Sequence, residues 1–469
     1  MEKNQELIGT VVATGSNGEG IIKQERFTVF VPFTLLGEKV RYKILKVKSK
    51  FAYAKLLEVL TPSEIRVRPR CPVFTKCGGC QLQHIKYCNQ LAIKEEGIKL
   101  TFKKVAGLEV YIKKTVQGDD SFRYRNKLQL PVAYSPEGAK LGFYAENSHR
   151  VVEISDCVIN AVWTKEIIAV FNKYIREFEL FGYDEINKSG DIREITVKEI
   201  KGNLIITIVT LKQNIPGLKT LIEYLKERLK TEFSLYINVN TKNTNVIYSD
   251  DFRLIYGNGD YTDEMLGVKY KIGVQSFMQV NSSVCAKLYS AVKNLVDADD
   301  KTVVIDAYSG AGLMTALLAS NAKKAIGIEI VSEAVDCANQ LAVMNKLDDK
   351  ITNYLGKCEE ILPTLIQKEK KENAKICLVL DPPRKGCDIK VIRSIIDSKI
   401  EKIVYVSCKP STLARDVGLL VGTLEEKDGE IVRTEEPVHR YVIDYVRPFD
   451  MFAHTKHVET LVCLKRNID

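Results

Sequence analysis

A cysteine stands at the end of an apolar run and is followed directly by Lys-Pro-Ser-Thr, in the segment VYVSCKPSTLARD (residues 404–416). We predict that the run is a strand and that a helix begins after it, with Ser411 or Thr412 as its cap. The helix start and Lys409 would favour the thiolate of Cys408, which is the nucleophilic form of the side chain. A buried strand also uses cysteine as a small apolar filler, so the surrounding sequence must decide between the two roles.

A glycine-containing turn suggests a cofactor site. The segment VVIDAYSGAG (303–312) reads as a strand that enters a turn with Gly310 and Gly312, followed by a helix. The next apolar run ends in Glu329, 17 residues after Gly312, and an acidic residue near this distance can accept hydrogen bonds from two ribose hydroxyls. The turn lacks the full G-x-G-x-x-G pattern, which favours S-adenosylmethionine over a dinucleotide.

A second loop of the same kind is LVLDPPRKG (378–386), in which an apolar run ends in Asp-Pro-Pro. Two prolines stiffen the loop and remove two backbone donors. Such a loop can hold a polar side chain and carbonyl groups against a flat ring. The alternative is a stiff turn with no ligand, which we consider the weaker interpretation on a cofactor-binding sheet.

The elements that must position these residues alternate between strands and helices. Residues 266–469 contain four apolar runs, TVVIDAY, KAIGIEI, ICLVLDPP and KIVYVSC, separated by stretches with helical spacing. Strands of this type form a parallel sheet buried on both faces, so we predict a doubly wound α/β domain. Open α/β sheets bind ligands at the carboxyl ends of their strands, and Cys408 stands at such an end.

A thiolate beside a methyl donor suggests attack on a pyrimidine. Carbon 5 of uracil is a poor nucleophile, but thiolate addition to carbon 6 gives an enolate whose carbon 5 can accept a methyl group. A base must then remove the carbon 5 proton before the thiolate can leave. Glu459, at the start of the apolar run TLVCL, could be that base if it is desolvated. The sequence alone favours an exposed charge at a strand edge.

Two further domains are expected before residue 266. Residues 1–60 read as five short strands with glycine turns, which predicts a small barrel of the oligonucleotide-binding type. Residues 1–70 hold 13 Lys and Arg against 7 Asp and Glu, which is compatible with a nucleic-acid partner. Residues 70–265 mix helical spacing, as in 87–105, with strand hairpins, and we assign them to an α+β domain.

Composition sets the broad class of the protein. The chain has 469 residues, of which 45% are hydrophobic and 28% charged, and its net charge is +9. These values are typical of a soluble globular protein with more than one domain. No apolar run spans a bilayer and no secretion signal is evident, so we expect a cytoplasmic protein with no membrane partner, and a monomer.

Three of the twelve cysteines are clustered, in CPVFTKCGGCQLQH (71–84). Cys71, Cys77 and Cys80 have C-x5-C-x2-C spacing, and a reducing cytosol disfavours disulfides. Zinc or an iron–sulfur cluster requires four ligands, and the spacing does not choose between them. Cys88, His84 or a distant residue such as Cys157 could be the fourth.

The chain resembles the RNA uracil-5-methyltransferase family, especially its bacterial 23S rRNA branch, and the motifs LDPPRKG, YVSCKPSTLARD and HTKHVETLVCL carry the resemblance. It implies that Cys408 is the nucleophile, that Glu459 accepts the proton, and that 5-methyluridine is formed in 23S rRNA, with tRNA as the alternative substrate. The N-terminal barrel is similar to a TRAM domain, which implies RNA binding. The implied S-adenosylmethionine site comprises Gln279, Tyr308, Glu329 and Asp381. The implied [4Fe–4S] ligands are Cys71, Cys77, Cys80 and Cys157.

Three other classes of protein fit the sequence less well. Radical RNA-modifying enzymes need three cysteines in C-x3-C-x2-C spacing, which differs from the spacing here. Methyltransferases that act on exocyclic nitrogens carry an aromatic residue after Asp/Asn-Pro-Pro, where this chain has Arg384, and they would leave Cys408 without a role. A catalytically silent RNA-binding protein would not need the pair Cys408 and Glu459.

Overall fold

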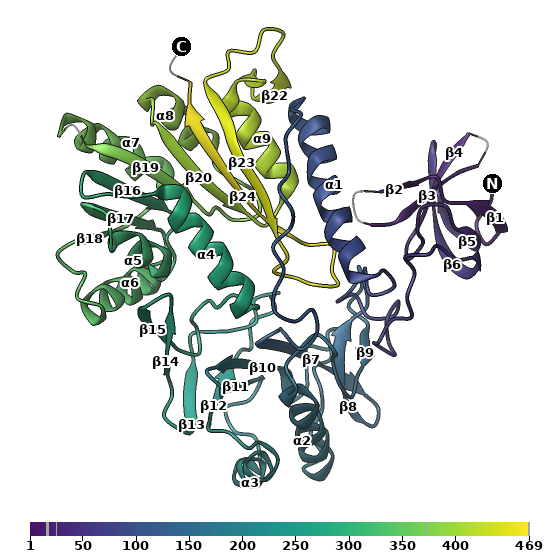
Figure 1. Ribbon diagram of the computed structural model, residues 1–469. Coiled ribbons are helices and arrows are strands. Elements are labelled where there is room, and N and C mark those ends of the chain that lie inside the picture. The colour runs from purple at the N-terminus through teal and green to yellow at the C-terminus, as the bar shows by residue number, and fades with distance from the viewer. Residues whose placement is uncertain (16–17, 25, 373, 468–469) are drawn as a thin grey trace.

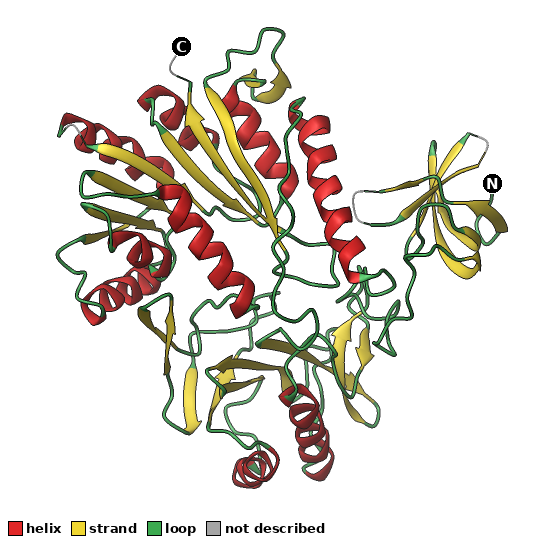
Figure 2. Ribbon diagram, viewed as in Figure 1, coloured by secondary structure: helices red, strands yellow, loops and turns green. Residues whose placement is uncertain are grey.

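The computed structural model describes residues 1–15, 18–24, 26–372 and 374–467. Within them the chain forms an N-terminal sheet, a central sheet with two helices, and a C-terminal sheet covered by helices on both faces (Figures 1 and 2). The N-terminal sheet stands to one side of the other two (Figure 1). No helix in the described part of the chain is both long enough and apolar enough to cross a bilayer.

The N-terminal sheet has six strands instead of the five expected, and one of them, at Ala13–Thr14, is only two residues long. In spatial order they are β1 (Glu6–Thr10), β5 (Lys39–Val47), β6 (Phe51–Thr61), β4 (Phe27–Val31), β3 (Gly20–Gln24) and β2 (Ala13–Thr14). Alternation places Val40, Tyr42 and Ile44 inside the fold. The sheet curls so that β1 approaches β3, where a Cβ on Gly9 would lie 2.8 Å from Ile22.

The central sheet is mostly antiparallel. Its strands in spatial order are β13 (Phe252–Tyr256), β12 (Phe233–Val239), β11 (Asn203–Thr210), β10 (Ile192–Ile200), β7 (Lys127–Ser135), β8 (Gly138–Tyr144) and β9 (Val151–Glu153). Helices α2 (Trp163–Glu177) and α3 (Leu218–Arg228) pack their apolar residues against the sheet in one core. The predicted hairpin at residues 135–138 is present as the β7–β8 turn. A separate hairpin, β14 (Tyr261–Met265) with β15 (Val268–Ile272), follows this sheet.

The C-terminal sheet confirms the predicted doubly wound α/β fold. Its order is β18 (Ile351–Leu355), β17 (Lys324–Glu329), β16 (Thr302–Ala307), β19 (Lys375–Leu380), β20 (Lys402–Ser407), β24 (Glu459–Arg466) and β23 (Tyr441–Phe449). The first five strands are parallel, and β24 runs antiparallel to β20. The strand order reverses between β16 and β19, which is where sheets of this kind bind ligands.

Helices cover both faces of this sheet. One core includes residues of α7 (Cys358–Lys371), α8 (Ile389–Ser398) and α9 (Pro410–Val421). The other core includes residues of α4 (Ser282–Val296) and α5 (Leu313–Ala319), and α6 (Ser332–Met344) packs against α5. The short hairpin of β21 (Leu424–Lys427) and β22 (Glu430–Arg433) follows α9.

Helix α1 (Tyr87–Ala106) confirms the helix expected at residues 87–105 but packs on the C-terminal sheet's helices. Its buried residues recur every four positions, at Gln90, Lys94, Ile98, Phe102 and Ala106, so they form one stripe. The apolar end of the stripe joins the core that contains α9. The two helices lie side by side (Figure 1), and a Cβ on Gly418 of α9 would stand 2.9 Å from the Ala106 side chain. Glycine there permits the close approach.

Candidate active site at the carboxyl ends of the sheet strands

Four predicted site residues lie at one edge of the C-terminal sheet. Tyr308 follows β16, Glu329 ends β17, Asp381 follows β19 and Cys408 follows β20. Glu459 begins β24, and because β24 is antiparallel its first residue lies at this same edge. The fold therefore brings together residues that are up to 151 positions apart in the sequence.

The glycine turn and Glu329 form one unit. The backbone is left-handed at Tyr308, Gly310 and Gly312, with φ of 69°, 54° and 82°. Glu329 holds the turn, since its Oε2 accepts a hydrogen bond of 2.9 Å from the Gly310 backbone N–H. At Gly312 a Cβ would lie 2.7 Å from the Cβ of Ala338, so this position requires glycine. The Oε1 of Glu329 also accepts from the N–H groups of Ile330 and Val331 at 2.8 and 2.9 Å, so most of the carboxylate's acceptor sites already hold backbone N–H groups.

Cys408 and Glu459 lie next to each other at the ends of neighbouring strands. Ser407 pairs with Thr460 across β20 and β24, so continuing the register by one residue places Cys408 opposite Glu459. Glu459 is only 6% exposed, which corrects the expectation of an exposed strand-edge charge. The cause is that β24 is an interior strand, with β20 on one side and β23 on the other.

Carboxyl groups with raised pKa values surround this point. Burial, together with the nearby Asp381 carboxylate, raises the pKa of Glu459 to about 8 against a smaller lowering by Arg384. Solvent can reach Asp381, but protein atoms crowd its carboxyl group and this desolvation raises its pKa to about 7. Asp306, in β16, behaves similarly: burial raises its pKa to about 7, with contributions from Asp381 and Glu329. The site therefore disfavours simultaneous ionisation of its carboxyl groups.

The environment of Cys408 differs from the expected one. Burial raises the pKa of its thiol, Glu459 raises it further, and Arg384 lowers it through charge and a hydrogen bond. The expected effect of the helix start and Lys409 on the thiolate is thus opposed by burial and by the neighbouring carboxyl groups of Glu459 and Asp381. The predicted cap is wrong: Lys409 is the N-cap of α9, without a side-chain hydrogen bond, and Pro410 occupies the first turn. Thr412 instead donates to the carbonyl of Arg384 at 3.3 Å.

The loop that carries Arg384 is fastened to α9. Asp416 accepts hydrogen bonds from the Cys387 N–H at 2.8 Å and from the Tyr405 hydroxyl at 2.6 Å. Arg415 donates to the carbonyl of Cys387 at 3.2 Å. A Cβ on Gly386 would lie 2.6 Å from the Arg415 and Asp416 side chains, so only glycine fits. Arg384 is therefore a residue of the site that was not predicted, although it is part of the LDPPRKG motif.

Gln279 lies in the loop before α4 and is half-buried. The central sheet holds this loop at two points. Lys198 of β10 donates to the carbonyls of Val274 and Ser276 at 2.7 and 2.5 Å, and the Asn126 N–H donates to the carbonyl of Val280 at 3.0 Å. The position of Gln279, a predicted cofactor residue, therefore depends on contacts with residues outside the C-terminal sheet.

The four cysteines of the predicted cluster come from two loops. Cys71, Cys77 and Cys80 lie before α1, and Cys157 lies between β9 and α2. Burial, with a contribution from each of the other three thiols, raises the pKa of Cys80 to about 12, so the four cysteines lie in one region of the fold. Among the described residues, no group of three or more His, Cys, Asp or Glu side chains has the arrangement that holds a metal ion. The ligand set stays a prediction.

The other two residues considered as ligands lie in different surroundings. Cys88 is exposed and its thiol contacts the Asn89 side chain at 3.4 Å. His84 is buried between Phe33 and Phe74, at ring distances of 6.1 and 5.7 Å. Desolvation lowers the pKa of this histidine to about 3.

Comparison with known proteins agrees with this architecture. The model of the tRNA (uracil-5-)-methyltransferase family matches residues 87–467, and that of the TRAM domain matches residues 6–57. An uncharacterized RNA methyltransferase from Clostridium acetobutylicum is 38% identical over 99% of this chain and 98% of its own length. One from Listeria monocytogenes is 35% identical over 100% and 99%.

A solved structure of similar fold is also known. The tRNA (uracil-54, C5)-methyltransferase of Pyrococcus abyssi, in complex with S-adenosyl-L-homocysteine, superposes with a TM-score of 0.75 at 25% identity. The match covers 97% of this chain and 99% of that one. The family resemblance read from the motifs is thus confirmed. The chain belongs to the tRNA (uracil-5-)-methyltransferase family of S-adenosylmethionine-dependent RNA methyltransferases and carries a TRAM domain at its N-terminus.

Proposed function

We propose that this protein methylates carbon 5 of uridine in 23S rRNA through a covalent adduct between Cys408 and carbon 6. The observation that carries the proposal is the neighbouring pair at the strand ends, a half-buried cysteine next to a buried glutamate. The reaction needs both groups on the same small ring, one to add and one to remove a proton.

The residues of the site fit S-adenosylmethionine, which supplies an electrophilic methyl group when bound. Glu329 stands at the glycine turn, where its Oε2, which accepts one backbone N–H, can also accept from a ribose hydroxyl, and Asp381 follows a strand that ends at the same edge. A cationic ligand bound here would lower the raised pKa values of Asp306, Asp381 and Glu459. Gln279 and Tyr308 complete the proposed set.

The residues of this chain then act in a defined order. Cys408 gives its proton to solvent, which Arg384 favours, and its sulfur bonds to carbon 6 while the electron pair of the bond between carbons 5 and 6 moves into an enolate. After methylation Glu459, as carboxylate, takes the proton from carbon 5. The bond between sulfur and carbon 6 breaks, which restores the double bond of the ring and releases the thiolate. A pKa of about 8 favours the protonated form of Glu459 at neutral pH, and a bound cation would favour the carboxylate that acts as the base.

Support for an RNA partner comes from the outer face of the TRAM domain. Phe30 of β4 and Phe51 and Tyr53 of β6 form a group of rings with centroids 5.5–6.0 Å apart. Tyr53 is 46% exposed and pairs with Lys46 of β5. Aromatic faces beside lysines suit single-stranded RNA, because bases stack on the rings while phosphates meet the charges.

An experiment can distinguish 23S rRNA from tRNA as the substrate. The resemblance to the bacterial rRNA branch favours 23S rRNA, whereas the similar solved structure is of a tRNA enzyme. Mass-spectrometric mapping of 5-methyluridine in rRNA and tRNA from a deletion strain tests the proposal. Loss of one or more 5-methyluridines from 23S rRNA is expected, and loss from tRNA alone would establish the alternative.

The proposal includes a [4Fe–4S] cluster on Cys71, Cys77, Cys80 and Cys157. A single zinc ion, at about 2.3 Å from each sulfur, would draw four thiols tightly together. A [4Fe–4S] cluster binds each thiolate to a different iron, so its four sulfur ligands lie further apart than those of a zinc ion. The Gly79 N–H donates to the Cys77 sulfur at 3.3 Å, and such hydrogen bonds stabilise cluster thiolates. Iron and sulfide analysis of anaerobically purified protein tests this, and zinc alone would overturn it.

Three units complete the proposal: residues 1–60 as the RNA-binding TRAM domain, 70–265 as the central domain and 266–469 as the methyltransferase domain. Helix α1 falls in the second range but shares the core of the third. It therefore joins the two units mechanically.

A further inference from the structure

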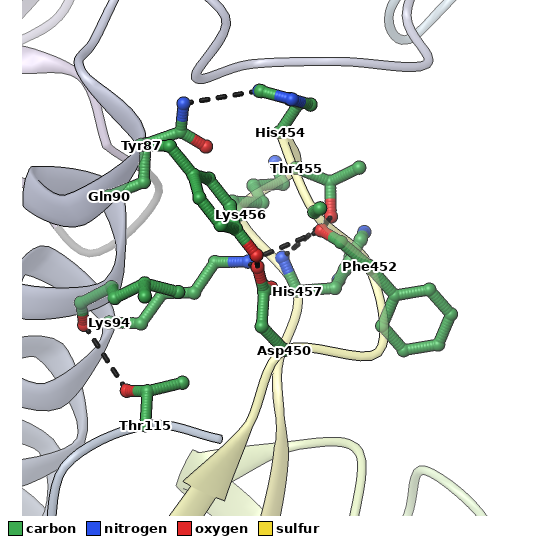
Figure 3. A network of polar contacts seen from close by, with 12 residues as sticks. Tyr87, Gln90, Lys94, Thr115, Asp450, Phe452, His454, Thr455, Lys456 and His457 are labelled. Atoms are coloured by element: carbon green, nitrogen blue, oxygen red, sulfur yellow. Dashed lines mark hydrogen bonds and ion pairs between the residues drawn. The ribbon is translucent and has the colours of Figure 1, made fainter. Parts of the chain in front are cut away.

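The loop between β23 and β24, residues 450–458, directly precedes Glu459 and contains a buried ion pair. Lys94 of α1 donates to Asp450 Oδ1 at 2.5 Å, and the Tyr87 hydroxyl donates to Oδ2 at 2.7 Å (Figure 3). The Lys94 and Asp450 side chains are 3% and 0% exposed. Lys94 also donates to the carbonyl of Phe452 at 3.2 Å. Both carboxylate oxygens are thus held by a helix that precedes the loop by some 350 residues.

A second group of contacts holds the middle of the same loop. The carbonyl of His454 accepts from the N–H groups of Gln81 and Leu82 at 3.1 and 2.9 Å. Its ring contacts Gln90 Nε2 at 3.1 Å (Figure 3) and lies 4.1 Å from the Phe122 ring. The backbone of His454 has φ of +66°, a conformation unusual for a residue with a side chain, so the surroundings must impose it.

The loop controls where Glu459 stands. Phe449, the last residue of β23, pairs directly with Glu459, and Asp450 follows it without a spacer. A shift of Asp450 therefore moves the strand pair that carries the glutamate. The contacts described above all come from residues 81–122, outside the C-terminal sheet.

Stability alone does not explain this arrangement. Burying an ion pair removes two charges from water, and an apolar pair of the same size often stabilises a fold as well or better. A buried pair with two defined hydrogen bonds does fix the carboxylate in one orientation.

We infer that Lys94 and Tyr87, acting through Asp450, are positioning residues that set Glu459 in place for proton removal from carbon 5. The inference rests on the proposed function. It predicts that loss of Lys94 slows the release step, which uses Glu459, and spares the addition step, which uses Cys408. Misplacing a catalytic group by about 1 Å can cost on the order of 100-fold in rate.

The test separates the two steps in the full-length protein. Addition is measured as the covalent complex formed with RNA containing 5-fluorouridine. Release is measured with methyl-labelled S-adenosylmethionine and RNA from a deletion strain. Samples taken over time are run on a denaturing gel, and the rate is that at which the label moves from the protein–RNA complex to free RNA. For Lys94→Met we expect addition within about twofold of wild type and release slowed about 10- to 100-fold, so that methylated RNA accumulates on the protein.

Lys324→Met is the matched control, because Lys324 pairs with the buried Glu369 at 3.0 Å at the far end of β17. We expect it to leave the ratio of the two rates unchanged. Equal slowing of both steps by Lys94→Met, or a ratio equal to that of the control, would overturn the inference. Should Lys94→Met fail to fold, Tyr87→Phe removes one hydrogen bond and must still slow release selectively. Wild-type protein that forms no fluorouridine complex would refute the proposed function instead.

Discussion

Replacing Glu459 by glutamine should stabilise the protein while it blocks turnover. The carboxyl group is buried beside Asp381, so the folded protein resists its ionisation and its pKa is about 8 against an ordinary 4.5. Proton removal from carbon 5 requires the ionised form. On the proposed mechanism the buried base therefore lowers the free energy of unfolding at neutral and alkaline pH. Glu459→Gln should restore that free energy and remove the base.

The magnitude follows from the two pKa values. Below pH 4.5 the carboxyl group is protonated in both folded and unfolded chains. As the pH rises from 4.5 to about 8, the unfolded chain ionises and the folded chain does not, so the free energy of unfolding falls by on the order of 5 kcal/mol at about 1.36 kcal/mol per pKa unit and then stays constant. Glu459→Gln escapes this loss. Its Tm should match wild type near pH 4.5 and exceed it at pH 9 by up to about 10 °C.

Calorimetry at several pH values measures the first effect, and a denaturing gel with ordinary RNA and labelled methyl donor measures the second. We expect methylated RNA to remain attached to Glu459→Gln, with release slowed about 100- to 10,000-fold. Glu369→Gln is the control, since Glu369 is also buried but lies away from the site. It should show neither effect. A Tm difference that does not grow with pH, together with normal release, would refute the reasoning.

Three further substitutions test other parts of the site. Arg384→Met should shift the rate profile to higher pH, because Arg384 lowers the pKa values of both Cys408 and Glu459; an unchanged profile would contradict this. Asp381→Asn should weaken S-adenosylmethionine binding at least tenfold in equilibrium dialysis, and undiminished affinity would remove Asp381 from the cofactor site. Tyr53→Ala should weaken RNA binding about tenfold in filter assays without changing the rate at saturating RNA, since stacking contributes about 1–3 kcal/mol per base.

The residues at the strand ends could be predicted from the sequence because each one directly follows or ends its own apolar run. Apolar runs that end in Cys408, Asp381 and Glu329 are parallel strands, and their carboxyl ends must share an edge. Glu459 could not be placed in this way, since a last antiparallel strand can lie at a sheet edge or inside it. Only the structure shows β23 covering β24 and burying the glutamate.

Contacts between segments far apart in the chain could also not be predicted from the sequence. The periodicity of α1 predicts a helix, but nothing in it shows that Lys94 faces Asp450 instead of solvent. A lysine within an apolar stripe was the available signal, because it breaks the pattern without a local partner. The Ser411 or Thr412 cap was wrong because Pro410 suits the first helical turn, which makes Lys409 the cap.

The central claim is that the sulfur of Cys408 bonds to the target uridine, and trapping with 5-fluorouridine RNA measures this most directly. In the presence of S-adenosylmethionine the fluorine at carbon 5 cannot be removed as a proton, so the adduct cannot resolve. Wild-type protein should give a complex that survives denaturation, with the RNA attached to the peptide containing Cys408, and Cys408→Ala should give none. An equally abundant complex with Cys408→Ala, or full methylation of ordinary RNA by that variant, would contradict the account.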